Sequence, residues 1–406
     1  MKTHGIRPAL SLLLFLTAFI ISFSVQPSAF GRDSTWRTEG LHRGQTVKRG
    51  IVILVRFPDV KHDLGRDLVQ ARFSRHLNRY VQQMSYNRVS LEIDLTERWY
   101  QMPDSISHYS ISPRNLEVDR SRVRKLLLDA INAADGEVEF SRYDFAAVFM
   151  AAKRNEYGMI GLCGYPGMLG WKTENILKTQ SGQRIHGGIA IFCYQAHVGT
   201  LFHDIAHILG GVKEGKRVLP CLYDHDLQAR PGPLRETAVA SMINMGFWDP
   251  MSCHFYKWGV PPPGLSSWSK MRLNWIDPSK IRVVDPGQKA DLMLGPLEDA
   301  SSEILVIKVP LSETTHYLIE NRQPIGCDAF LPGNGVLIMY ADDRVAECRH
   351  GMAPVKLINA DPSVPNLEGA AFDIGRKAYF KDGKNKISIQ LKEKVEGSYR
   401  ILISPL

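Results

Sequence analysis

The first clear pattern in the chain is a run of β-branched and apolar residues at 50–56, with no polar residue before Arg56. Such a run is typical of a strand that is buried on both faces of a sheet. Further strands are predicted by similar runs or by alternation of apolar and polar positions. These further segments are residues 90–100, 146–152 and 187–194.

Helical spacing of apolar residues lies between these strand-like segments. Residues 67–84 and 121–134 read as amphipathic helices, and residues 200–209 as a mostly apolar helix that ends at Gly210-Gly211. Because strands and helices alternate, we predict an α/β (α+β) domain over residues 50–279.

The pattern changes after residue 279, where helical spacing disappears and short strand-like segments recur between turns. This is the signature of a sandwich or barrel, so we predict a β-rich, β-sandwich-like C-terminal domain over residues 280–406. The segments are residues 304–309, 316–321, 335–341, 386–391 and 398–403.

The N-terminus has the three parts of a signal peptide. Lys2 and Arg7 precede an apolar stretch at 10–25, and Ala29 and Gly31 frame a cleavage site. We therefore expect a cleaved signal peptide over residues 1–31 and a polar lead-in over 32–49. No second stretch approaches the roughly 20 apolar residues that span a bilayer. A secreted or extracytoplasmic protein without a stable membrane span is predicted.

Composition narrows the possible partners. Hydrophobic residues make up 44% and charged residues 23% of the 406 positions, which are ordinary values for a globular protein. The formal charge of +8 is spread along the chain without a basic block, so nucleic-acid binding is not predicted. The six cysteines fit an oxidising compartment and permit three disulfides. A cysteine in a disulfide cannot also bind a metal ion.

The segment His203-Asp204-Ile-Ala-His207 carries the clearest chemistry. Histidines four apart on a helix project from one face, so both imidazoles can reach one metal ion. This is the spacing of H-E-x-x-H metallopeptidases, where the Glu after the first His is the general base. Here that base position holds Asp204, which is one methylene shorter. Two histidines satisfied by hydrogen bonds are the alternative interpretation.

A catalytic zinc site needs a third protein ligand and one open position. Downstream of the helix the residue types allow four ligands, and the sequence does not choose between them. They are Cys221, Asp224, Asp226 and Glu236.

Several collinear segments resemble the immune inhibitor A family of secreted bacterial zinc metallopeptidases. The resemblance covers about residues 50–343, including the helix at 199–210. The remaining segments are Tyr80-Val-Gln-Gln-Met-Ser-Tyr86, Trp99-Tyr-Gln-Met-Pro103 with Tyr109, Leu219-Pro-Cys-Leu-Tyr-Asp224, Trp248-Asp-Pro-Met251, Leu265-Ser-Ser-Trp-Ser-Lys270 through Leu273-Asn-Trp275, Tyr317-Leu-Ile-Glu-Asn-Arg-Gln323, Leu331-Pro-Gly333 and residues 335–340.

The resemblance implies a zincin-type domain with zinc held by His203 and His207, and a methionine turn that places Met251 beneath the site. Asp224 matches a family residue and is our choice of third ligand, with Cys221 as its rival. Glu320 and Arg322 are expected to form a structural pair in the β-rich region. Structural calcium is a further possibility, given carboxylates in loops; these are Asp224, Asp226, Asp342 and Asp343.

The chain departs from the family pattern at three places near the site. The general base is Asp204, the expected Asp after Leu219-Pro220 is Cys221, and an extra stretch at 211–218 separates the helix from that element.

Two functions follow as expectations. The first is a secreted zinc endopeptidase, a hydrolase of extracellular proteins or peptides in which Asp204 acts as the base. The alternative is a catalytically impaired pseudopeptidase that binds protein or peptide. A third and weaker reading makes the β-rich region an attachment module.

Overall fold

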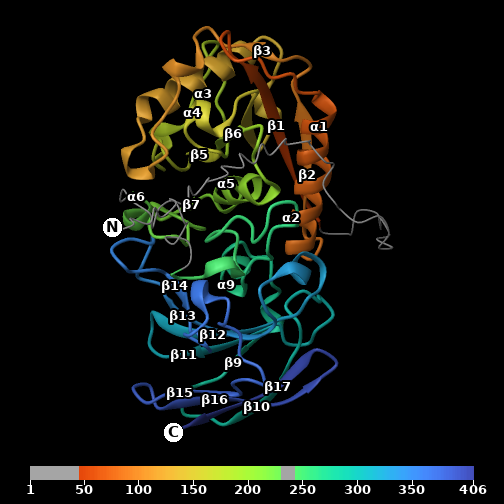
Figure 1. Ribbon diagram of the computed structural model, residues 1–406, viewed down its shortest axis with the longest axis vertical. Helices are drawn as coiled ribbons and strands as arrows, with labels where there is room; N and C mark the ends of the chain where they lie inside the picture. The colour runs from red at the N-terminus through yellow and green to blue at the C-terminus, as the bar shows by residue number, and fades with distance from the viewer. Residues whose placement is uncertain (1–44, 230–242) are drawn as a thin grey trace, which may run out of the picture.

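The computed structural model describes residues 45–229 and 243–406. The first half of the chain forms a mixed six-stranded sheet in the order β2-β1-β4-β6-β5, with β3 also paired to β1 (Figure 1). Only β5 runs antiparallel to its neighbour, and it forms one edge of the sheet. The strands are β1 (Thr46–Arg56), β2 (Val89–Leu95), β3 (Tyr100–Gln101), β4 (Phe145–Met150), β5 (Gly161–Tyr165) and β6 (Ile189–Cys193).

Helices cover both faces of this sheet because alternate residues of its buried strands point to opposite sides. Ile51 and Ile53 pack with α3 (Arg120–Ala134) in one buried cluster. Val52 and Leu54 pack on the other face with α5 (Val198–Gly210) and a long helix. That helix is continuous from α1 (Arg66–Gln70) through a π-helical segment (Ala71–Leu77) to α2 (Asn78–Met84). Shorter helices are α4 (Arg154–Tyr157), α6 (His225–Ala229) and α9 (Ser267–Arg272).

The helices predicted at 67–84, 121–134 and 200–209 are present, and the six-stranded sheet differs from the prediction in three ways. The strand predicted from residue 50 already begins at Thr46, inside the predicted lead-in. The segment 90–100 divides into β2 and β3, which pair with successive parts of β1. β5 was not predicted, because a short strand with two glycines has little strand propensity. The predicted signal peptide and residues 32–44 lie outside the described residues.

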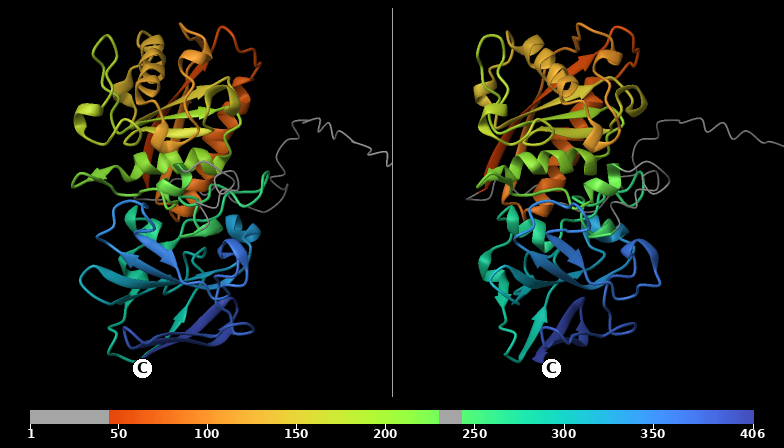
Figure 2. Two further views of the ribbon diagram at one scale, coloured as in Figure 1. Left: turned by 60° about the vertical axis from the view of Figure 1, so that its left-hand side comes forward. Right: turned by 90° about the vertical axis from the view of Figure 1, so that its left-hand side faces the viewer.

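The later part of the chain is β-rich, as predicted, and forms two sheets (Figure 2). A five-stranded sheet has the order β14-β13-β12-β11-β9, and a four-stranded sheet the order β10-β17-β16-β15. The two sheets enclose a buried cluster that includes Ile307, Ile338 and Ile401. The strands are β9 (Ile281–Val283), β10 (Ala290–Leu294), β11 (Val306–Pro310), β12 (Thr315–Arg322), β13 (Gly335–Asp342), β14 (Val355–Leu357), β15 (Tyr379–Asp382), β16 (Ile387–Val395) and β17 (Ser398–Pro405).

One hydrophobic core crosses the predicted domain boundary at 279/280. A single buried cluster contains Val52 of β1, Phe202 of α5, Leu337 of β13 and Val355 of β14. The fold is therefore a mixed α/β structure with several sheets in which the two regions share buried side chains. None of the helices among residues 45–229 and 243–406 is long and apolar enough to cross a membrane.

All six cysteines lie in the described residues, and all are free. The expectation of three disulfides is therefore not met. Five of the six side chains are buried. Cys163, Cys327 and Cys348 belong to one apolar cluster, whereas Cys221 Sγ lies beside the imidazole of His203.

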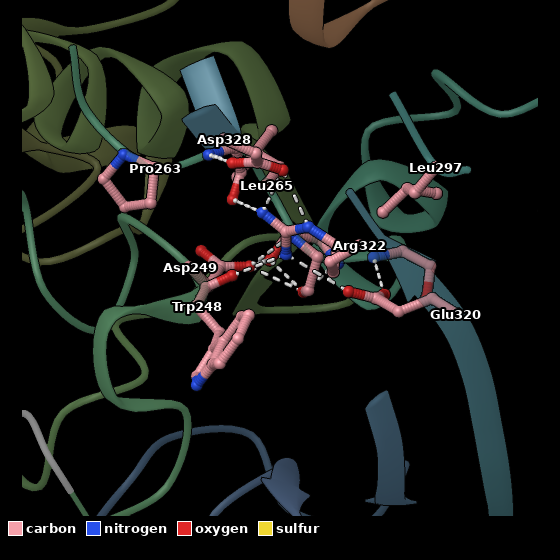
Figure 3. A network of polar contacts seen from close by, with 12 residues as sticks. Trp248, Asp249, Pro263, Leu265, Leu297, Glu320, Arg322 and Asp328 are labelled. Carbon is pink, nitrogen blue, oxygen red and sulfur yellow. Dashed lines mark hydrogen bonds and ion pairs between the residues drawn. The ribbon is translucent and has the colours of Figure 1, made fainter. Parts of the chain in front are cut away.

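The most heavily charged part of the core surrounds Arg322 at the end of β12 (Figure 3). Its side chain is fully buried and makes ion pairs with Glu320, Asp328 and Glu298 at 3.2, 2.6 and 3.1 Å. It also donates to the Trp248 carbonyl at 2.9 Å and the Gly264 carbonyl at 3.0 Å. The expected structural role of the Glu320–Arg322 pair is confirmed, and the network ties β12 to two loops of the first region.

Replacing Arg322 with Met should lower the free energy of unfolding by about 3–5 kcal/mol, because three buried carboxylates would lose their cation. The matched control is Arg344→Met: the Arg344 side chain is 67% exposed in its pair with Asp342, so a much smaller loss is expected. Urea unfolding of both variants measures the difference. Equal small losses would contradict a stabilising role for the Arg322 network.

Candidate metal centre

The helix α5 presents both histidines of the motif from one side. It begins after His197, whose Nδ1 accepts a hydrogen bond from the Gly199 N–H at 3.1 Å. It ends at Gly210, and the following Gly211 adopts a positive φ of 65°. His203 and His207 are almost fully buried in its middle. The predicted metal helix is therefore present with the expected orientation of its histidines.

Three ligand atoms converge at one point. His203 Nε2 and His207 Nε2 are 3.2 Å apart, and Cys221 Sγ lies 3.5 and 3.4 Å from them. Within the described chain, this is the one group of three or more His, Cys, Asp or Glu residues with the spacing of a metal site. These three residues could hold a metal ion.

Backbone carbonyls fix the two imidazole rings. His203 Nδ1 donates to the Pro250 carbonyl at 3.0 Å, and His207 Nδ1 donates to the Leu219 carbonyl at 2.7 Å. A neutral imidazole that donates from Nδ1 carries a lone pair on Nε2, as metal ligation requires. Both lone pairs therefore point at the same small space, a geometry that fits a shared cation.

The structure places Cys221 beside the two imidazoles, and not Asp224, our choice of third ligand from the sequence. Asp224 Oδ1 accepts from the N–H groups of Asp226 and Leu227, and Oδ2 accepts from Gly351 N–H at 3.0 Å. These bonds start α6 and hold the carboxylate away from the imidazoles. Asp226 pairs with Arg349, and Glu236 lies outside the described residues.

Cys221 lies in a strongly polar environment despite its burial. Burial alone would raise the pKa of its thiol, but the charges of His207, Arg217 and His203 outweigh that effect and hold the pKa well below its usual range. The thiolate is the form that binds metal ions, and Arg217 favours ligation because it stays charged when both imidazoles are neutral ligands.

Asp204 points towards the edge strand β5. Its carboxylate lies against Gly161 of that strand, and its buried Oδ2 has no hydrogen-bond partner. A Cβ on Gly161 would lie 2.8 Å from that oxygen, so only glycine leaves room for it. Burial raises the pKa of Asp204 to about 7, with the negative charge of Cys221 adding to the effect and His203 opposing it.

A cavity of about 420 Å³ opens over these residues. Its lining includes Gly161, Leu162 and Cys163 of β5. Ile160 accepts from the Cys193 N–H of β6, so the antiparallel alternation turns the Gly161 N–H and carbonyl away from β6. The β-rich region also reaches this cavity through Glu347 and Arg349.

Several residues beside the ligands were not predicted from the sequence. The His254 ring centroid is 4.4 Å from that of His203, and its Nδ1 lies 3.1 Å from Thr200 Oγ1. Arg217 and Glu347 form an ion pair at 2.8 Å next to Cys221. His254 follows the proposed methionine turn by three residues, which could have drawn attention to it. No local signal joins Arg217 to Glu347, because 130 positions separate them.

The turn around Met251 lies against the metal helix. Met251 is fully buried, and the carbonyl of its neighbour Pro250 accepts from His203. Asp249 fixes the turn: its carboxylate accepts from the Met251 N–H at 2.8 Å and from Ser266 and Ser269. The segment thus orients a ligand through its backbone.

The four carboxylates considered for calcium make other contacts. Asp342 pairs with Arg344, and Asp343 lies 3.6 Å from Arg272. Asp224 caps α6, and Asp226 pairs with Arg349. They do not gather into a candidate site among the described residues.

Comparison with known proteins adds no family assignment. No family model matches the sequence, and no curated protein matches it.

We expect purified protein to retain a divalent metal ion that is lost in His203→Ala, His207→Ala and Cys221→Ser, since each variant removes one donor. Asp224→Asn is the matched control and should keep the metal, because an Asn can still cap α6. Elemental analysis after dialysis measures the bound metal. Metal retention in Cys221→Ser together with loss in Asp224→Asn would reverse the assignment of the third ligand.

His197 should make stability depend on pH. Its Nε2 donates to the Val260 carbonyl while Nδ1 accepts from Gly199, so the fold requires the neutral ring. Burial lowers its pKa to about 4, with the charge of Arg72 adding to the effect. Its stabilisation is therefore complete above about pH 6.5 and is lost as the pH falls to about 4, by up to about 3 kcal/mol.

The measurement is urea unfolding at pH 7 and pH 4.5 for the wild type and for His197→Asn, whose amide can cap the helix without titrating. The variant should lose less stability between these two pH values. An equal loss in both proteins would show that His197 does not contribute.

Proposed function

We propose that this chain is a secreted, zinc-dependent endopeptidase of the zincin type, related to the immune inhibitor A family. The observation that carries the proposal is the convergence of His203 Nε2, His207 Nε2 and Cys221 Sγ beside the unpartnered Oδ2 of Asp204. Nitrogen and sulfur donors suit zinc, and three protein ligands leave the open position that catalytic zinc sites keep. Zinc bound there would supply Lewis acidity for polarising a peptide carbonyl and for activating water.

The protein residues divide the remaining work. The Pro250 and Leu219 carbonyls hold the ligand rings in their metal-binding tautomer. The outward N–H and carbonyl of Gly161 can pair with the backbone of an extended peptide along the free edge of β5. Asp204 would accept a proton from water at Oδ2 and pass it to the leaving amine.

A second function follows from the position of Asp204. Its side chain is one methylene shorter than a glutamate, and its carboxylate lies against Gly161 of β5. A displacement of about 1 Å can cost on the order of 10²-fold in rate. A pseudopeptidase that binds peptides without turnover is therefore the alternative.

Mature wild-type protein should cleave an unbiased peptide library, and a chelator should stop the cleavage. Asp204→Asn should keep its metal and lose about 10²–10⁴-fold in rate, because it lacks the base. The control Asp226→Asn makes the same substitution at a carboxylate that pairs with Arg349, and this variant should cleave at the wild-type rate. Mass spectrometry of the products gives both rate and cleavage site.

Peptide binding without turnover in folded, metal-loaded protein would favour the pseudopeptidase. Cleavage that survives Asp204→Asn would remove Asp204 from the mechanism.

A further inference from the structure

Arg217 is a positively charged side chain that the structure brings to the candidate ligand Cys221 from outside helix α5, next to His225 and Glu347. It ends a two-stranded hairpin of β7 (Val212–Lys213) and β8 (Lys216–Arg217). The turn is made by Glu214 and Gly215, both at positive φ. Lys213 and Lys216 are exposed on this hairpin, whereas the Arg217 side chain is only 8% exposed.

Arg217 contacts both an acid and the ligand sulfur. Its Nε and Nη2 donate to the two carboxylate oxygens of Glu347 at 3.0 and 2.8 Å. The same Nη2 lies 4.0 Å from Cys221 Sγ, at the long end of an N–H···S contact. An Nη2 group has two hydrogens, so one can face Glu347 while the other faces the sulfur. The ring of Trp171 lies 5.9 Å from the guanidinium carbon.

The bidentate pair fixes the guanidinium with its positive end towards the sulfur. Glu347 comes from the β-rich region and also approaches His225 at 3.7 Å. Residues 218–220 join Arg217 to Cys221, and the Leu219 carbonyl in this link orients the ligand His207. The hairpin, the ion pair and two ligands therefore form one connected unit.

A metal-bound thiolate keeps part of its negative charge on sulfur and donates more electron density to the metal than a carboxylate or an imidazole. In a buried site, such a charge is costly unless a fixed positive charge compensates it. Residues that contact a ligand in this way typically change metal affinity by 10–100-fold when they are replaced.

We propose that Arg217, clamped by Glu347, is a positioning residue for the metal: it compensates the charge of Cys221 in the metal-bound state. The inference rests on the metal site of the proposed function, but it does not depend on peptide hydrolysis. Arg217 would make a thiolate usable in a site that must still polarise a substrate.

The test uses Co²⁺ as a spectroscopic probe in the full-length mature protein. Sulfur-to-cobalt charge-transfer absorption reports the electron richness of the ligand sulfur, and titration gives the affinity. Arg217→Gln should bind Co²⁺ about 10–100-fold more weakly, with the charge-transfer band at longer wavelength. Unchanged affinity and unchanged band position would overturn the proposal.

Two further variants separate charge from structure. Arg272→Gln is the matched control: Arg272 donates to the Val218 carbonyl at 3.1 Å and so supports the same segment without contacting the sulfur. It should keep both the affinity and the band of the wild type. If it weakened binding as much as Arg217→Gln, with neither band shifted, a purely structural role would replace ours.

The double variant Arg217→Gln/Glu347→Gln removes both charges, so no acid is left buried without a partner and folding is protected. It should still show weaker binding and the shifted band. Recovery of wild-type affinity and band position would mean that Arg217 only neutralises Glu347, which overturns the proposal. Wild-type protein that takes up no Co²⁺ would overturn the metal site itself, and this inference with it.

Discussion

The orientation of His203 on α5 depends on the turn at residues 248–251, and Arg322 of the β-rich region holds this turn in place. Arg322 at the end of β12 donates to the Trp248 carbonyl, two residues before the Pro250 carbonyl that orients His203. A charge buried so deeply is tolerated only because three carboxylates surround it. The three carboxylates, Arg322, the turn at 248–251 and the His203 imidazole are therefore connected through the core.

Much of the local structure could be predicted from sequence because it reflects local periodicity. The buried strand that became β1, the helices α3 and α5, and the five strand segments after residue 280 all follow from spacing alone. β5 could not be found in this way, since it is short and gains its stability from pairing with β6. The predicted disulfides failed because cysteine count carries no information about distance in the fold.

The candidate site was predictable only in part, because spacing along the chain gives local contacts but not contacts between distant residues. His203 and His207 lie one turn apart on one helix, so their spacing was enough to predict that their side chains lie side by side. The choice between Cys221 and Asp224 depended on Gly351, which engages the Asp224 carboxylate from 127 positions away. Two departures from the family pattern also meet in space: Arg217 from the extra stretch lies beside Cys221. Each departure taken alone suggests a loss of activity, whereas the two together fit the proposal that Cys221 is a ligand and Arg217 its counter-charge.

The shared core limits how the two regions of the chain can evolve. One apolar cluster joins β1 and α5 to β13 and β14, and Glu347 from the β-rich region reaches the candidate ligand sphere. Recombination that replaced the C-terminal half with an unrelated β module would expose one side of that cluster. It would also leave Arg217 without its ion-pair partner Glu347. The two halves must therefore evolve together. A substitution on one side of position 280 should be accompanied by a compensating substitution on the other side.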